Sequence, residues 1–198
     1  MDGQVARRLI LASASPRRHQ LLTQMGYAFT VDPAHIDEEA VSAKGPAALA
    51  EKLALLKAQA IAERQDTPAL VIGADTVVVS RGKVLGKPAD EDEAAAMLKR
   101  LSGSWHRVVT GVALVETPGK RYLVSHETTA VRFAPMTEAE IRDYLRTGDS
   151  MDKAGAYGIQ GRAGVHIPRI RGCYFNVMGL PLHKLHVMLR EIGYPLPS

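Results

Sequence analysis

Hydrophobic positions along the chain switch between the two-residue period of strands and the three-to-four-residue period of helices. The most apolar run, Ala69–Val79, predicts a strand buried on both faces and interrupted by Asp75 and Thr76. The other predicted strands are Leu9–Ala12, Tyr27–Val31, Arg107–Val115, Tyr122–Phe133, Val165–Ile170 and Tyr174–Met178. The last two are expected to form a hairpin that turns at Arg171 and Gly172.

Helices are predicted where apolar residues at helical spacing follow a start signal. They begin at Pro16 and Pro46, after the capping residues Asp90 and Thr137, and at about Leu182. The helix at Pro46 should bury a stripe of Leu49, Leu53, Leu56 and Ala60. The helix after Thr137 should turn Ile141, Tyr144 and Leu145 inward.

The alternation of strands and helices, with some antiparallel pairs, defines the expected fold class. We predict an α/β fold with a mixed twisted sheet and flanking helices. No internal repeat and no low-complexity linker divides the sequence, so residues 1–198 are expected to form a single domain.

Composition excludes several classes of protein. With 46% hydrophobic and 23% charged residues, the chain is neither disordered, collagen-like nor a coiled coil. No apolar run approaches the ~20 residues of a membrane helix, and the residues from Met1 to Leu11 show no secretory signal. Cys173 is the single cysteine and is expected to be an inert filler in a strand. A reducing, cytoplasmic location follows from this cysteine usage.

The formal net charge of +4 favours an anionic partner. Lysines and arginines are spread along the chain without a basic run, which argues against a nucleic-acid polymer. His183 and His186 are three residues apart, but no third ligand suggests a zinc site.

Asp75 is the first candidate for chemistry. A carboxylate in a doubly buried strand costs several kcal/mol unless it is paired, metal-bound or protonated. Gly73, two residues earlier on the same side, is expected to leave open space beside it. The residue is therefore a candidate base or metal ligand, with a satisfied structural aspartate as the alternative.

The turn between the first strand and helix is a candidate anion site. Ser15 and Pro16 fit the N-cap and N1 positions, so free backbone N–H groups point out of the helix end. Arg17 and Arg18 lie in the first turn, where a cation is unfavourable unless an anion compensates it. An ordinary cap with solvated arginines is the alternative.

Lysines and a glycine-rich segment complete the candidates. Lys57 and Lys87, each taken alone, are expected at the solvated surface, with the stem of Lys57 along the sheet edge. The stretch 82–88 is one residue short of a P-loop and has Pro88 where Ser or Thr is required. Segment 152–161 is rich in small residues, which indicates backbone packed closely against a ligand, with a plain loop as the alternative.

Several of these motifs, in their order along the chain, resemble those of the Maf family of nucleoside triphosphate pyrophosphatases, once described as septum-formation inhibitors. The motifs are Leu11–Arg18, Gly73–Val78, Gly86–Pro88, Leu101–Gly103, Asp152–Gly161 and Val177–Pro181. The resemblance implies two lobes around a central cleft, similar to inosine triphosphate pyrophosphatases, and a homodimer. It also implies hydrolysis of a nucleoside triphosphate to the monophosphate and pyrophosphate with Mg²⁺ or Mn²⁺.

The resemblance assigns roles by matching position. Asp75 resembles the proton acceptor, and Glu38 and Asp75 are the expected metal ligands. Arg18, Thr76 and Gln160 resemble the specificity positions. The remaining matched pocket positions are Ser13, Arg17, Lys57, Lys87, Asp152 and Lys153.

Two positions select a subgroup. Arg17 and Gln160 resemble the dTTP/UTP subgroup, whereas a 7-methyl-GTP subgroup has an aromatic residue and a glutamate there. A Gln160 side chain offers both a donor and an acceptor, which suits the imide edge of uracil or thymine. The alternatives are a purine-directed pyrophosphatase of the same family and a nucleotide-binding regulator of septum formation.

Overall fold

The computed structural model describes residues 7–119, 121–195 and 197. It divides into two compact units. Unit 1 takes its described residues from the segments 1–75, 110–127 and 179–198, and unit 2 from 76–109 and 128–178. The expectation of one functional domain over residues 1–198 stays a prediction. The absence of a secretory signal is predicted from residues 1–11, and residues 1–6 of this segment lie outside the described residues.

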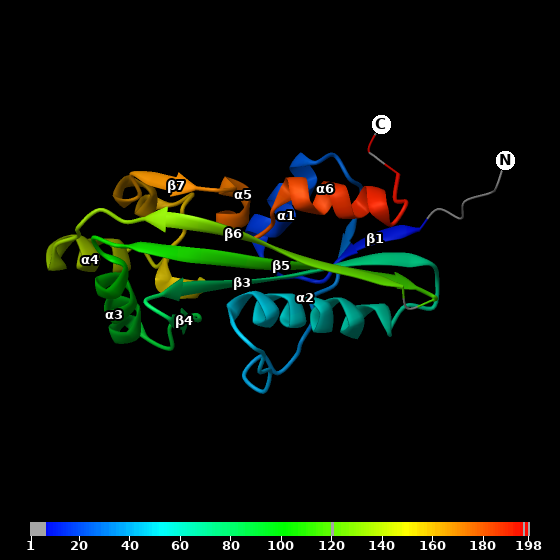
Figure 1. Ribbon diagram of the computed structural model, residues 1–198, viewed down its shortest axis with the longest axis horizontal. Helices are drawn as coiled ribbons and strands as arrows, with labels where there is room; N and C mark the ends of the chain where they lie inside the picture. The colour runs from blue at the N-terminus through cyan, green and yellow to red at the C-terminus, as the bar shows by residue number, and fades with distance from the viewer. Residues whose placement is uncertain (1–6, 120, 196, 198) are drawn as a thin grey trace. The chain divides into compact units, whose positions relative to one another are not determined.

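The helices and strands follow one another in the alternating order that the sequence predicts (Figure 1). They are β1 (Arg8–Leu11), α1 (Pro16–Gln24), β2 (Thr30–Val31), α2 (Pro46–Ala62), β3 (Ala69–Ser80), β4 (Lys83–Leu85), α3 (Glu91–Leu101), β5 (Trp105–Thr117), β6 (Tyr122–Arg132), α4 (Glu138–Leu145), two 3-10 turns (Ala154–Ala156 and Arg162–His166), β7 (Arg169–Arg171), α5 (Tyr174–Met178) and α6 (Leu182–Glu191).

The strands form a mixed sheet, which confirms the predicted fold class. Their order is β2-β1-β3-β5-β6-β7, and β4 pairs with β3 off this path. β1 runs parallel to β2 and β3, whereas β4 is antiparallel to β3 and β7 is antiparallel to β6. Among the described residues, no helix is long and apolar enough to cross a membrane.

In unit 1, α2 packs unusually close to the sheet. Its buried face contains the small residues Ala50, Ala54 and Ala58. A Cβ at Gly73 would collide with the carbonyl oxygen of Ala54, and a Cβ at Gly111 with that of Ala50. The two glycines therefore let the helix backbone touch the strands, and Gly73 does not border open space as the sequence suggested.

This contact overturns the predicted stripe of α2. Of Leu49, Leu53, Leu56 and Ala60, only Leu53 is fully buried. The alanines of α2 face the sheet because leucines at those positions would hold the helix axis farther from the strands. Sequence periodicity weights residues by hydrophobicity and cannot register that two glycines lie opposite.

In unit 2, the predicted helix starts are confirmed. The Asp90 side chain accepts from the N–H of Glu93 at 2.8 Å, and Thr137 forms a complete capping box with Glu140. Ile141, Tyr144 and Leu145 of α4 are buried as predicted. They join a core cluster that also holds the apolar faces of α3, β5 and β6.

The predicted hairpin at the end of unit 2 is wrong. Residues 174–178 form α5, and β7 pairs with β6 instead. The Asn176 side chain donates to the carbonyl oxygen of Val108 at 3.0 Å and to Thr129 Oγ1 at 2.9 Å, which ties the helix to two strands. Cys173 consequently lies between β7 and α5 rather than in a strand, and its N–H donates to Thr129 Oγ1.

The close contact of α2 predicts a large effect for Gly111→Ala. The added methyl group would push the helix off the sheet, and we expect a loss of about 2–4 kcal/mol in the free energy of unfolding. Urea denaturation measures this loss. Gly86→Ala is the matched control, because a Cβ there meets nothing within 4 Å. Equal stability of the two variants would refute the close-packing account.

Candidate functional site

A buried cluster of opposite charges lies where α2, β3 and the loop between β2 and α2 meet. Lys57 Nζ lies 2.6 Å from Asp75 Oδ1 and 2.8 Å from Glu38 Oε1. Lys57 is 8% exposed and Asp75 is 7% exposed. The surface position expected for Lys57 is therefore wrong: its stem lies in the close contact between α2 and β3, and its ammonium offsets the cost of burying Asp75.

The turn between β1 and α1 has the cap and first-turn residues that the sequence predicts. Ser15 is the N-cap by position, although its side chain makes no capping bond, and Pro16 is the first helical residue. The first turn of α1 contains no acidic residue. Its backbone N–H groups and positive helix end are therefore not neutralised by a local carboxylate.

Two hydrogen bonds within unit 1 orient Arg18 in this turn. Its Nη1 donates to Ser13 Oγ at 3.1 Å, and its Nε donates to the carbonyl oxygen of Gly179 at 2.8 Å. Burial lowers the pKa of Arg18, while the negative charges of Asp75 and Glu38 raise it and Arg17 lowers it further. The guanidinium thus lies within the electrostatic reach of the carboxylate cluster.

In unit 2, Lys153 is held between two carboxylates. Its Nζ lies 2.7 Å from Asp149 Oδ1 and 2.5 Å from Asp152 Oδ1. Lys153 is buried, whereas Asp152 is exposed. The loop that follows bends back through Gly155, which has a φ of +72° and donates its N–H to the carbonyl oxygen of Gly86 at 2.9 Å. This bond joins the loop of Lys87 to the loop of Lys153.

Asp149 is a residue that the sequence reasoning missed. Its carboxylate occupies the place that a Cβ on Gly161 would take, and the Tyr144 hydroxyl lies 3.5 Å from its Oδ2. The Gly158 N–H donates to the same hydroxyl at 3.3 Å. The glycines of this segment therefore pack against the protein itself. The spacing of Asp149 four residues before Lys153 was the signal available in the sequence.

Tyr157 anchors the same loop in the core of unit 2. Its hydroxyl lies 2.7 Å from Nε2 of His106, and its ring packs edge-on against Phe133. Burial raises the pKa of Tyr157 and lowers that of His106 to about 4. Gln160 follows three residues later and is exposed at the surface of unit 2.

The structure brings some predicted residues together within each unit. In unit 1, bonds or charges connect the β1–α1 turn with the buried pair, through Ser13, Arg17, Arg18, Glu38, Lys57 and Asp75. In unit 2, Lys87 is joined to the loop of Asp152 and Lys153 through the backbone. Thr76 is partly buried and begins the unit 2 part of β3, directly after Asp75.

Unit 1 offers a hard divalent cation two carboxylate ligands, which is fewer than a complete set of protein ligands. Within the described residues, no group of three or more His, Cys, Asp or Glu side chains could hold a metal ion. Glu38 and Asp75 supply carboxylate oxygens, and both contact one ammonium. Mg²⁺ is commonly held by one or two carboxylates with substrate phosphates and waters completing its shell. The two carboxylates fit that pattern.

Comparisons with known proteins agree with the motifs. A family model described as Maf-like protein matches residues 8–192. A dTTP/UTP pyrophosphatase of Symbiobacterium thermophilum is 57% identical over 188 residues, 95% of each chain. Another, of Pelotomaculum thermopropionicum, is 51% identical over 94% of this chain and 97% of its own. A solved dITP/XTP pyrophosphatase of Mycobacterium abscessus covers 94% of this chain and 98% of its own at 16% identity, with a TM-score of 0.41.

Removing the shared ammonium should destabilise unit 1. In Lys57→Met, Asp75 stays buried without its partner, and we expect a loss of about 3 kcal/mol or more in the free energy of unfolding. Lys52→Met is the matched control, because Lys52 is exposed on the same helix. The double variant Lys57→Met with Asp75→Leu should recover much of the loss. A Lys57→Met protein as stable as the control would contradict the buried pair.

His106 predicts a dependence of stability on pH. The unfolded chain takes up a proton at this residue near pH 6.5, whereas the folded chain does so only near pH 4. Stability is therefore full above pH 6.5 and falls by up to about 3 kcal/mol as the pH drops through this window. NMR titration of the imidazole measures the pKa directly, and His106→Phe should flatten this part of the stability profile. Titration of His106 near 6.5 would show that it is not buried as described.

Proposed function

The chain belongs to the Maf-like protein family, and on that premise we propose that it hydrolyses dTTP and UTP to the monophosphate and pyrophosphate. The observation that supports this most directly is the buried Asp75 carboxylate, held by Lys57 near the charge of Arg18. The activity named for the relatives at 57% and 51% identity gives the reaction and its substrates.

The cations of unit 1 are suited to a triphosphate. A triphosphate chain brings concentrated negative charge, so hydrolysis depends mainly on positioning and charge neutralisation. The N-terminus of α1 supplies backbone N–H groups. Arg17 and Arg18 supply guanidinium groups, which can bind phosphate in a bidentate manner. Arg18 is already oriented by Ser13 and Gly179, so little side-chain entropy is lost when it binds.

Asp75 is the residue that we assign to the attacking water. Lys57 contacts Oδ1, and we assign Oδ2 to accept the proton as the water attacks the α-phosphorus. The electron pair of the broken bond between the α-phosphorus and its bridging oxygen leaves with pyrophosphate. Lys57 fixes the carboxylate in one orientation, which is the requirement for a general base.

Glu38 and Asp75 are the residues that would hold a divalent metal ion, with phosphate oxygens as further ligands. A bound Mg²⁺ or Mn²⁺ would neutralise charge on the phosphates. Glu38 comes from a loop and is partly exposed, with 48% of its side chain accessible, so it can exchange Lys57 for a metal ion at small cost.

The remaining residues of the proposed binding set are those that the family resemblance assigns. Gln160 presents a donor and an acceptor for the imide edge of the base, with Arg18 and Thr76 as the other specificity positions. Lys87, Asp152 and Lys153 complete the proposed binding set. Asp149 and Tyr144 position this loop without being assigned to the substrate.

The resemblance also supports a homodimer, and the cysteine usage supports a cytoplasmic location; we propose both with the activity. A purine-directed pyrophosphatase is the alternative among enzymes, and a nucleotide-binding regulator of septum formation is the alternative without turnover. The buried carboxylate favours the enzyme, because a protein that only binds anions gains nothing from a negative charge beside its cations.

Release of pyrophosphate from a panel of nucleotides tests the proposal. With Mg²⁺ or Mn²⁺, we expect turnover of dTTP and UTP in preference to dGTP, ATP and 7-methyl-GTP. Asp75→Asn should lower kcat by about 100-fold to 10,000-fold while much of the nucleotide binding remains. Asp66→Asn, an exposed aspartate in the loop before β3, is the matched control and should leave kcat unchanged.

Two results would count against the proposal. No release of pyrophosphate from any pyrimidine triphosphate would exclude the activity, and preferential release from 7-methyl-GTP would favour the purine alternative. Undiminished turnover by Asp75→Asn would remove Asp75 from the reaction and leave the activity itself standing.

A further inference from the structure

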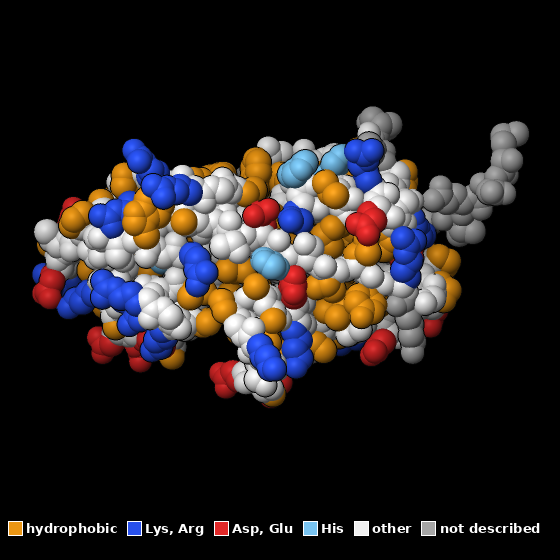
Figure 2. All heavy atoms as spheres, viewed as in Figure 1, with side chains coloured by type: hydrophobic (Ala, Val, Ile, Leu, Met, Phe, Trp, Pro, Cys, Tyr) orange, Lys and Arg blue, Asp and Glu red, His pale blue; other side chains and the backbone are white. Residues whose placement is uncertain are grey.

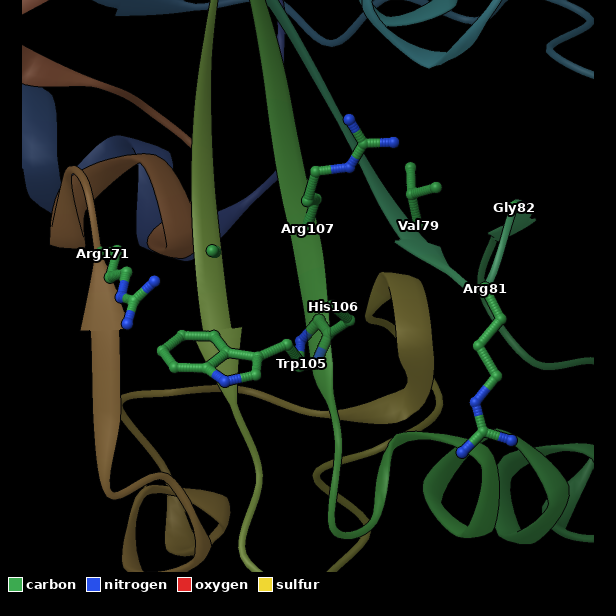
Figure 3. A pocket seen from close by; sticks show the side chains of 8 residues that line it. Val79, Arg81, Gly82, Trp105, His106, Arg107 and Arg171 are labelled. Atoms are coloured by element: carbon green, nitrogen blue, oxygen red, sulfur yellow. The ribbon is translucent and has the colours of Figure 1, made fainter.

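Unit 2 contains a cavity that none of the residues proposed above lines. Its volume is about 330 Å³, and it lies over the β3–β4 hairpin, β5, β6 and β7 (Figure 3). The lining residues that matter here are Val79, Arg81, Trp105, Arg107, Ala130 and Arg171. The cavity is therefore assembled from four neighbouring strands and one turn of a single unit.

The lining is cationic without a compensating acid. It includes three arginines and no aspartate or glutamate. Across the described part of the chain, the ion pairs do not involve Arg81, Arg107 or Arg171. Figure 2 shows lysine and arginine side chains over β7 and the strands beside it. Guanidinium groups without carboxylate partners are available to bind a phosphate in a bidentate manner.

An aromatic ring is exposed among these cations. Trp105 is 38% exposed, although tryptophan is usually well buried. The guanidinium carbon of Arg171 lies 4.9 Å from the centre of its ring, and Figure 3 shows Arg171 extending from β7 toward Trp105. Arg107 extends from β5 beside Val79. A stacking surface next to phosphate-binding cations is the combination that recognises a nucleotide.

The strands hold these groups in place. Arg171 is the register partner of Ala130 in the pairing of β7 with β6, so its backbone is fixed beside the cavity. Arg81 has a φ of +47° in the two-residue turn with Gly82, a conformation in which Asn or Gly is favoured. A ligand site on paired strands is more precise than one on a free loop.

We propose that this cavity binds one nucleoside monophosphate, with the base on Trp105 and the phosphate on the arginines that line the cavity. The volume is at the lower end of the ~300–1,000 Å³ of small-molecule pockets, which suits one nucleotide rather than a strand. The site uses no residue of the proposed hydrolytic reaction, so the two proposals can be tested independently.

Trp105 itself reports on the proposal, because it is the single tryptophan of the chain. We expect UMP to quench its fluorescence saturably in the intact protein. Uridine and ribose 5-phosphate, each lacking one half of the ligand, should bind at least about tenfold more weakly. Arg107→Gln and Arg171→Gln should each weaken UMP binding by about tenfold or more.

Matched variants separate this cavity from the proposed hydrolytic site. Arg190→Gln removes the same charge from an exposed position on α6 and should leave the quenching unchanged. Lys87→Gln should impair hydrolysis and also leave the quenching unchanged. Loss of hydrolysis with intact quenching would thus concern the proposed function alone.

Three outcomes would overturn the proposal. The first is the lack of a saturable change in Trp105 fluorescence up to about 10 mM UMP. The second is quenching that survives in Arg107→Gln and Arg171→Gln but disappears in Lys87→Gln. The third is binding of an oligothymidylate at least about tenfold tighter than UMP, which would identify the surface as a site for single-stranded nucleic acid.

Discussion

The contact between Lys57 and Asp75 is the constraint around which unit 1 is built. A carboxylate inside a β-strand requires a partner, and the partner must come from an element close enough to reach it. The alanine face of α2 and the bare backbone at Gly73 and Gly111 provide that closeness. Small residues in this layer are thus a condition for the buried charge, because bulkier side chains would separate the helix from the strand that carries Asp75.

Unit 2 also contains a buried lysine that is paired with two carboxylates. Lys153 is buried between Asp149 and Asp152, as Lys57 is between Asp75 and Glu38. In each cluster one carboxylate is more buried and the other comes from a more exposed position. Glycines again permit the arrangement, since Gly161 leaves room for the Asp149 carboxylate. A lysine shared by two acids orients both, and either acid can turn to another cation while the other keeps the ammonium paired.

The sequence was informative wherever a local rule decides the structure. The helix starts at Asp90 and Thr137 and the inward face of α4 depend on neighbouring residues, and they were predicted correctly. The alternation of strand and helix patterns also predicted the mixed sheet. Asp75 was recognised because its cost in a buried strand is evident without a partner. The burial of Lys57, the role of Asp149 and the helix at 174–178 were missed because each depends on residues distant in sequence, such as Gly73, Gly161 and Thr129.

The cavity at Trp105 and the charged cluster of unit 1 differ in their acidic residues, and this difference limits what each can do. Binding a phosphate needs cations and N–H donors, and a nearby carboxylate weakens it. The cavity at Trp105 has arginines without acids in its lining, which is the composition expected of a site that only binds. The cluster in unit 1 keeps Asp75 and Glu38 near Arg18 despite the electrostatic cost to anion binding. Carboxylates retained at that cost are in keeping with the roles proposed above, in which Asp75 takes a proton from water and Glu38 and Asp75 hold a metal ion.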